Sequence, residues 1–173
     1  MSTYTQILYH VVFATKDRRP VLSDSRRDVL YKYMSGVIKN SPCRTVWING
    51  VKDHLHLLLS LHPTAALADL LKDIKVASSV WIQEKGVFPN FVGWQEGYQA
   101  FTYALRDEPD LIMYLKGQGE HHRKVTFEEE YRKLLLEAGI KIDVRNFPEP
   151  IRPLRGRQHI GGIDSWSVGF AYG

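Results

Sequence analysis

The chain has 173 residues, 44% of them hydrophobic and 24% charged, which is typical of one well-buried globular domain with some additional length. These values exclude a fibrous or wholly disordered protein, and no apolar run approaches the length of a membrane span. The net charge of +4 is too small to indicate a nucleic-acid partner by itself, and the single cysteine excludes an internal disulfide. The N-terminus lacks a secretory signal pattern, so we expect a cytoplasmic protein without a membrane partner.

The first half of the chain predicts a strand, a helix and a hairpin. Residues 6–15 are apolar and rich in β-branched and aromatic side chains, which favours a strand. A helix capped by Ser23 or Ser25 follows, with apolar residues at helical spacing. Residues 44–50 and 54–60 predict two further strands, and the short link between them predicts an antiparallel hairpin.

The last of these strands begins with His54-Leu55-His56. Because alternate side chains of a strand share a face, the two imidazoles point the same way, with Cα atoms roughly 6–7 Å apart. Leu58 shares their face, and the opposite face carries Leu55, Leu57 and Leu59. Two neutral imidazoles can bind one metal ion, but a His-x-His pair is equally compatible with a half-exposed strand that binds nothing. A catalytic ion normally takes a third protein ligand, which must come from elsewhere in the chain.

The next part of the chain completes a recognisable order of elements. A helix is expected to open at Pro63-Thr64, and residues 97–104 predict a fourth strand. The order strand, helix, strand, strand, helix, strand is that of the ferredoxin-like split βαβ motif. We therefore predict an α+β fold in which a four-stranded antiparallel sheet carries two helices on one face, with the other face free for a partner or a nucleic acid.

Two more helices are expected after the fourth strand. Asp107 and Pro109 predict the start of a short helix in which Tyr114 and Gln118, four residues apart, lie on one face. A capping box at residues 126–129 predicts a last helix. Structural signals fade after that helix, so we assign residues 1–142 to one folded domain. Residues 143–173 are expected to form an irregular C-terminal tail.

With these elements in order, the chain resembles the single-tyrosine HUH transposases, the TnpA-like enzymes that move an insertion sequence as single-stranded DNA. The resemblance covers about residues 6 to 140. It rests on the first strand with its basic exit (9–22), the His-hydrophobic-His motif (54–56), the lead into the fourth strand (94–98), the Tyr-x-x-x-Gln motif (114–118) and Glu120-His121-His122.

The resemblance implies a DNA transposase whose catalytic domain spans residues 1–142 and whose C-terminal helices carry the nucleophilic tyrosine. It would cleave and rejoin single-stranded DNA at hairpin-bearing element ends through a covalent 5′-phosphotyrosine intermediate. Tyr114 is implied as the nucleophile, and His54, His56 and Gln118 as ligands of one divalent ion, Mg²⁺ or Mn²⁺. A homodimer is implied as well, in which each tyrosine serves the histidine pair of the other subunit. The phosphotyrosine stores the bond energy for rejoining, so no nucleotide cofactor is expected.

Several side chains near these motifs are candidates for supporting roles. Basic residues follow the first strand and recur on the second helix. Each cluster alone is more typical of a solvated face, but around a metal site they suggest a track for DNA phosphates formed by Arg18, Arg19, Lys72 and Lys75. Asp53 either orients an imidazole or serves the turn. His10 is expected to be structural or to lie near DNA.

Other functions remain open at this point. Histidine-triad nucleotide hydrolases also carry alternating histidines in a strand, but the third position here is Leu58. A domesticated relative that processes repeated extragenic palindromes could share every active-site residue, and hairpin-bearing ends in the neighbouring DNA would distinguish a mobile transposase from it. A ferredoxin-like module that binds single-stranded DNA without cutting it is the third possibility, which the intact Tyr114 and histidine pair disfavour.

Overall fold

The computed structural model describes residues 5–121 and 125–139. The expected tail at 143–173 and the domain boundary at 142 lie outside these residues. In chain order the elements are β1 (Ile7–Ala14), η1 (Lys16–Arg18), α1 (Asp24–Lys39), β2 (Cys43–Gly50), β3 (His54–Leu61), α2 (Leu67–Lys85), β4 (Gln99–Ala104), η2 (Leu105–Asp107), α3 (Glu108–Lys116), α4 (Gln118–His121) and α5 (Phe127–Glu137). None of the helices in the described part is long and apolar enough to cross a membrane.

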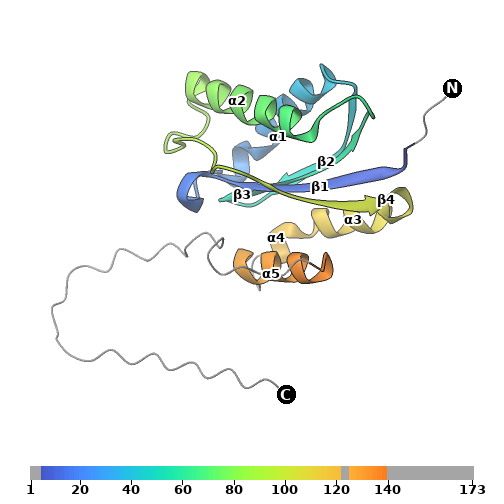
Figure 1. Cartoon of the computed structure of the whole chain (residues 1–173). Helices are drawn as coiled ribbons and strands as arrows, with labels where there is room; N and C mark the ends of the chain where they lie inside the picture. The colour runs from blue at the N-terminus through green and yellow to red at the C-terminus, as the bar shows by residue number, and fades with distance from the viewer. Residues whose placement is uncertain (1–4, 122–124, 140–173) are drawn as a thin grey trace, which may run out of the picture.

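The four strands form one sheet in the order β2-β3-β1-β4, and every neighbouring pair is antiparallel. Helices α1 and α2 cover one face of this sheet, and α3, α4 and α5 lie against the other (Figure 1). The predicted α+β, ferredoxin-like fold is confirmed. In the central part of the sheet His54 pairs with Ala14, and His56 pairs with Val12.

The main hydrophobic core lies between the sheet and the helices α1 and α2. Leu55, Leu57 and Leu59 of β3 point into it and pack with α1 and α2 side chains such as Met34 and Ile74. Each of these five side chains is completely buried, and full burial of such a side chain stabilises the fold by about 1.5–3 kcal/mol. The predicted alternation of leucines is confirmed, and it directs the histidines of β3 to the opposite face of the sheet.

The opposite face of the sheet is also covered, so the prediction that it would be free was wrong. Leu8 and Leu58 pack against Leu111 and Leu115 of α3. Nearby, side chains from β1 and β4 pack against the apolar side of α5, in a cluster that includes Val12, Phe101, Phe127, Leu134 and Leu135. The C-terminal helices carry apolar stripes that must be removed from water, and the histidine face of the sheet supplies the matching surface.

Two helix boundaries differ from their predictions. Helix α2 begins at Leu67 rather than at Pro63-Thr64, because Ala66 has an extended backbone and the amide of Ala65 closes a turn onto the carbonyl of His62. Helix α3 ends at Lys116, and the amide of Gly117 donates to the carbonyls of its last turn. Gln118 therefore starts the short helix α4 instead of continuing the helix that carries Tyr114.

Candidate active site

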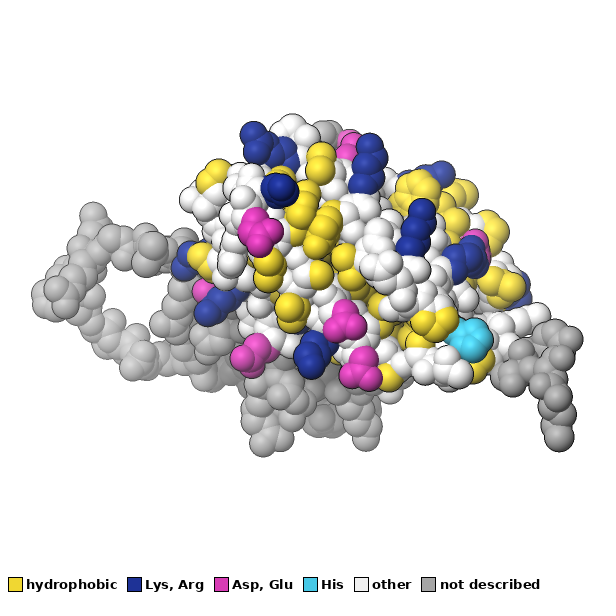
Figure 2. Space-filling model, turned by 90° about the horizontal axis from the view of Figure 1, so that it is seen from above, with side chains coloured by type: hydrophobic (Ala, Val, Ile, Leu, Met, Phe, Trp, Pro, Cys, Tyr) yellow, Lys and Arg dark blue, Asp and Glu magenta, His cyan; other side chains and the backbone are white. Residues whose placement is uncertain are grey.

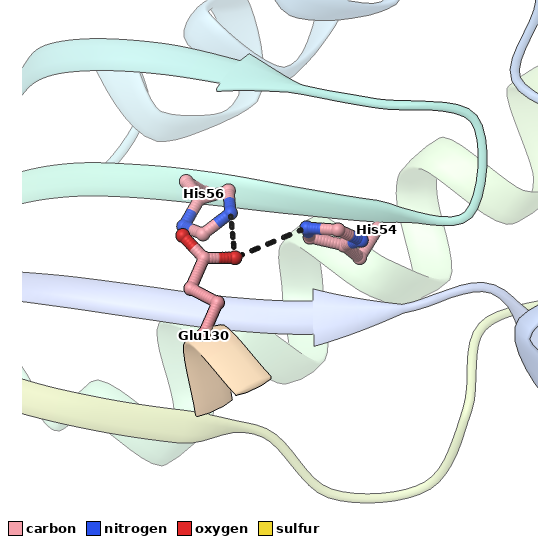
Figure 3. Close-up of side chains that lie close together, drawn as sticks. All are labelled: His54, His56 and Glu130. Carbon is pink, nitrogen blue, oxygen red and sulfur yellow. Dashed lines mark ion pairs between the residues drawn. The ribbon is translucent and has the colours of Figure 1, made fainter. Parts of the chain in front are cut away.

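The site is built on the beginning of strand β3. His54 and His56 are both completely buried, on the sheet face that α3 and α5 cover. Their Nε2 atoms each lie 3.8 Å from Oε2 of Glu130. Figure 3 shows the side chain of Glu130 pointing toward both imidazoles. One ligand atom from each of the three residues lies within 4.8 Å of the others. Two imidazole nitrogens and a carboxylate oxygen at this spacing are a suitable donor set for one divalent ion.

Glu130 also connects the histidine pair to the tyrosine motif. It lies on α5 and is only 2% exposed. Its Oε1 accepts a hydrogen bond from the hydroxyl of Tyr114 and another, of 2.9 Å, from Nε2 of Gln118. The Oε1 atom of Gln118 is buried without a hydrogen-bond partner among the described residues. The predicted nucleophile and ligands thus converge on one carboxylate, although their roles stay predictions.

Glu130 was missed in the sequence. A signal for it exists, because Phe127, Glu130 and Leu134 follow each other at helical spacing along one face of α5. Phe127 and Leu134 are buried. A carboxylate on the buried stripe of an amphipathic helix is costly unless it is paired, so it marks a candidate site residue.

Asp53 and Arg18 support His54 from the side away from Glu130. Oδ1 of Asp53 lies 2.8 Å from Nδ1 of His54, and Arg18 bonds to the other carboxylate oxygen at 2.9 Å. The Arg18 guanidinium also lies 4.1 Å from the centre of the Phe127 ring. Burial acts to raise the pKa of Asp53, but its hydrogen bonds with His54 and Arg18 and the positive charge of Arg18 outweigh burial and hold that pKa below its usual range. Of the two roles considered for Asp53, the contact with an imidazole is present.

His10 lies beside His56 on the neighbouring strand. It is 1% exposed, and its Nε2 is 2.9 Å from Nδ1 of His56. Burial lowers the pKa of His10 to about 4, although the negative charge of Glu130 acts in the opposite direction. His10 is therefore a neutral imidazole at physiological pH.

Tyr114 is half-buried and neutral in this arrangement. Burial, the hydrogen bond to Glu130 and the negative charge of Glu130 all raise the pKa of the Tyr114 phenol above its usual range. A phenol that attacks phosphorus must lose its proton, and the carboxylate of Glu130 is the group that already accepts the hydrogen bond. The geometry thus places a proton acceptor next to the candidate nucleophile.

The four basic residues expected to contact DNA are not gathered in one place. Arg18 adjoins the site, whereas Arg19 is exposed and lies near Asp17. Lys72 and Lys75 are on α2, across the sheet from the histidines (Figure 1). Lys75 donates to the backbone carbonyls of two residues that precede β4. Figure 2 shows the α1 and α2 side of the molecule, where basic side chains are scattered around a band of hydrophobic ones.

A groove of 720 Å³ opens next to the site, between the β2–β3 turn, helix α1 and the C-terminal helices. Its walls include four basic side chains, those of Arg18, Arg27, Lys52 and Lys116. Of these four, Arg18 alone belongs to the set predicted to contact DNA. Lys52 and Lys116 are distant from it in the sequence and become its neighbours through packing. His122, part of the motif that follows Gln118, lies outside the described residues.

Comparison with known proteins finds a matching family and similar sequences. The model of a family described as "Transposase IS200 like" matches residues 3–118. The transposase for insertion sequence element IS200 of Salmonella typhimurium is 25% identical over 150 residues, which cover 87% of this chain and 90% of that protein. The ISDra2 transposase TnpA of Deinococcus radiodurans is 31% identical over 120 residues, which cover 65% of this chain and 84% of that protein.

A similar fold is found among solved structures. One example is the crystal structure of a Deinococcus radiodurans protein assigned as a transposase, which superimposes with a TM-score of 0.55 at 24% identity. The alignment covers 68% of this chain and 95% of that one. This likeness supports the arrangement of strands and helices described above.

Proposed function

Because the chain belongs to the IS200-like transposase family, we propose that it cleaves and rejoins single-stranded DNA at hairpin-bearing element ends, with Tyr114 as the nucleophile. The observation that supports this proposal best is that Tyr114 and the histidine pair face the same buried carboxylate, although Tyr114 and Glu130 lie 16 residues apart. Because the two residues are distant in the chain, the local sequence around Tyr114 does not account for this contact.

In the proposed reaction, the phenolic oxygen of Tyr114 attacks the scissile phosphorus. The new Tyr–O–P bond forms as the bond to the 3′ oxygen breaks, and that oxygen takes a proton from solvent water and leaves as a 3′-hydroxyl. The phenolic proton passes to Oε1 of Glu130, which already accepts its hydrogen bond. Rejoining reverses these steps with a 3′-hydroxyl as the attacking group, so no nucleotide cofactor is needed.

We assign the metal site to the Nε2 atoms of His54 and His56, with Gln118 and Glu130 as the oxygen donors. The donor set fits a divalent ion, because two buried imidazoles converge with a buried carboxylate. The side-chain oxygen of Gln118 is buried and accepts no hydrogen bond from any described residue. Bound Mg²⁺ or Mn²⁺ would supply Lewis-acid stabilisation of the scissile phosphate.

A covalent-adduct experiment tests the nucleophile. The wild-type protein incubated with a labelled single-stranded hairpin oligonucleotide should give a protein–DNA adduct that survives a denaturing gel. Tyr114→Phe should bind the oligonucleotide and give no adduct. Tyr131→Phe is the matched control, because Tyr131 also lies on the C-terminal helices and its ring stacks on Phe127. An adduct with Tyr114→Phe would refute the assignment, and binding without cleavage by the wild type would favour a non-cutting module.

A chelation experiment tests the metal. Excess EDTA should abolish cleavage while leaving hairpin binding largely intact, and added Mg²⁺ or Mn²⁺ should restore it. His54→Ala should remain inactive after metal is added. Full cleavage in EDTA would remove the metal from the mechanism.

The proposal includes a homodimer that binds single-stranded DNA with hairpins. In the structure described here, one chain supplies both histidines and Tyr114 of a site. The expectation that each tyrosine serves the partner's histidines therefore requires α3 to occupy a different position in the dimer. An experiment that decides between the two arrangements is given in the Discussion.

A further inference from the structure

His10 makes a contact that none of the roles assigned above uses. It lies on the central strand β1, and its Nε2 is 2.9 Å from Nδ1 of His56. The two rings are stacked, with centroids 5.2 Å apart and planes inclined by 21°. Phe101, Tyr103 and Tyr114 pack around the His10 ring, with centroids 6.2–6.3 Å from it. This packing fixes the position of His10, and among the described residues its Nδ1 has no hydrogen-bond partner, so the contact with His56 is the one hydrogen bond of its ring there.

The direction of this hydrogen bond decides what His56 can do. A neutral imidazole carries one proton, so one ring nitrogen donates and the other accepts. If His10 donates, the proton of His56 sits on Nε2, the atom that faces Glu130, and that nitrogen cannot bind a metal. If His56 donates through Nδ1, its Nε2 keeps a lone pair. The separation of 3.8 Å between Nε2 of His56 and Glu130 is too long for a hydrogen bond that would hold the proton there.

The tautomer of His54 is set in the same way, by a carboxylate instead of an imidazole. Its Nδ1 lies 2.8 Å from Asp53, and an ionised carboxylate can only accept. The proton of His54 is therefore on Nδ1, and its Nε2 lies 3.8 Å from Oε2 of Glu130. The Nε2 atoms of both histidines keep a lone pair only if His10 accepts a hydrogen bond from Nδ1 of His56, as Asp53 accepts one from Nδ1 of His54.

We propose that His10 is a positioning residue that accepts a hydrogen bond from Nδ1 of His56 and so directs the Nε2 lone pair of His56 into the space shared with His54 and Glu130. The use of that lone pair for a metal rests on the proposed function. The tautomer is a property of the metal-free chain and can be measured without any metal.

The first measurement is the side-chain ¹⁵N spectrum of the metal-free protein labelled at histidine. His56 should be protonated on Nδ1 in the wild type, with the signals assigned by comparison with His56→Ala. His10→Gln should preserve this state, because the amide oxygen of glutamine can occupy the place of Nε2 and accept. His10→Phe, which keeps the ring but cannot accept, should shift the proton of His56 towards Nε2. Protonation of wild-type His56 on Nε2 would overturn the proposal.

The second measurement is Mn²⁺ affinity, followed by the electron paramagnetic resonance signal of the free ion. Loss of a group that orients a metal ligand typically weakens binding by about 10–100-fold. We expect a loss of this size for His10→Phe and a loss of only a few-fold for His10→Gln. His62→Gln is the control, since His62 is exposed and bonds to Thr64. Equal losses in His10→Phe and His10→Gln would reduce His10 to a packing residue and contradict the proposal.

The two measurements separate two kinds of failure. If wild-type protein shows the expected His56 tautomer but binds no Mn²⁺, the proposed metal site is wrong and the role of His10 in orienting His56 stands. If the metal binds and the tautomer is unaffected by His10→Phe, the metal site stands and the role of His10 is refuted. Thermal denaturation of each variant shows whether lost affinity merely follows lost folding.

Discussion

At the scale of single residues, the carboxylate of Glu130 is the group on which the proposed chemistry depends most. It faces the histidines with one oxygen and accepts a hydrogen bond from the Tyr114 hydroxyl with the other. Glu130→Gln keeps the size and an acceptor but removes the charge, so we expect Mn²⁺ affinity to fall by about 10–100-fold and adduct formation to slow as well. Glu137→Gln, at the exposed end of the same helix, is the control. Equal affinity and adduct rate in both variants would exclude Glu130 from the site.

Gly50 controls the geometry of the turn that leads into the histidine strand. A Cβ atom at this position would lie 2.4 Å from the carbonyl oxygen of His54 and 2.6 Å from Cδ2 of Leu55. The obstruction is partly backbone, so Gly50→Ala should lower the free energy of unfolding by about 1–3 kcal/mol and displace His54.

Gly36→Ala is the matched comparison for this substitution. Gly36 is exposed on α1 with no atom within 4 Å of the added Cβ, and alanine there should raise the free energy of unfolding by about 0.5–1 kcal/mol. Urea denaturation measures both changes, and cleavage assays show whether only Gly50→Ala affects the site. A stable and active Gly50→Ala protein would contradict the account of this turn.

Asp53 gives the site a predictable dependence of stability on pH. Its pKa in the folded chain lies below the usual value, so its ionised form stabilises the fold above the unfolded-state pKa of about 3.9. That contribution is lost as the pH falls through the lower folded-state pKa. The free energy of unfolding should therefore be higher for wild type than for Asp53→Asn at pH 7, and the difference should shrink in acid. Urea denaturation at both pH values tests this, and a difference that grows on acidification would contradict it.

At the scale of elements, two helices hold the reactive groups against the sheet. Helix α3 is tied to the edge strand β2 at both ends, because Arg44 pairs with Glu108 at 2.8 Å and Asn49 donates to the carbonyl of Leu115. Helix α5 is held by its apolar face and begins with a complete capping box, in which Thr126 accepts from the amide of Glu129. The position of Glu130 therefore depends on the first turn of α5.

Removing the N-cap side chain of α5 should destabilise the first turn of that helix and so weaken the site. Thr126→Ala leaves the amide of residue 129 without its partner, so we expect faster amide hydrogen exchange across the first turn of α5 and several-fold weaker Mn²⁺ binding. Ser23→Ala provides the comparison, because Ser23 also precedes a helix but its side chain makes no capping hydrogen bond. Equal exchange behaviour of the two variants would show that the cap does not hold α5.

At the scale of the whole molecule, the path of the DNA can be located by its salt dependence. Each lost phosphate contact should lower the slope of log affinity against log salt by about 0.7. We predicted contacts for Arg18, Arg19, Lys72 and Lys75, of which the last two lie across the sheet from the site. Slopes lowered by alanine at Arg18 and Arg19 alone would restrict the DNA to the histidine side. Unchanged slopes in all four variants would place the DNA elsewhere, and Lys52 and Lys116 of the groove would then be the next candidates.

Subunit mixing decides whether the tyrosine acts within its own chain. His54→Ala and Tyr114→Phe subunits each form only inactive sites with themselves. In the conformation described here Tyr114 faces the histidines of its own chain, so every site of a mixed dimer retains one defect and cleavage should not return. Recovery of cleavage would show that α3 leaves β2 and that the sites are shared, as the family resemblance implies. Heterodimer formation is verified by differently tagged subunits.

The sequence by itself determined the features that depend on local patterns. The alternation in β3 placed His54 and His56 on one face and the leucines on the other, because the side-chain period of a strand is fixed by the backbone. The order of strands and helices was enough for the ferredoxin-like fold, because few topologies accommodate it. The family resemblance that the Tyr-x-x-x-Gln motif carries selected Tyr114 and Gln118 as candidates, although the helix end at Gly117 was not predicted.

Only the tertiary structure decided which groups meet around the histidines. His10 and His56 are 46 residues apart in the chain, and Asp53 and Arg18 are 35 apart. Glu130 reaches the histidines because the apolar side of α5 packs on a sheet face that we had expected to be free. These contacts follow from the burial of apolar surface between distant segments, which local patterns do not specify, and the chemistry of the site is set by the polar groups that this burial brings together.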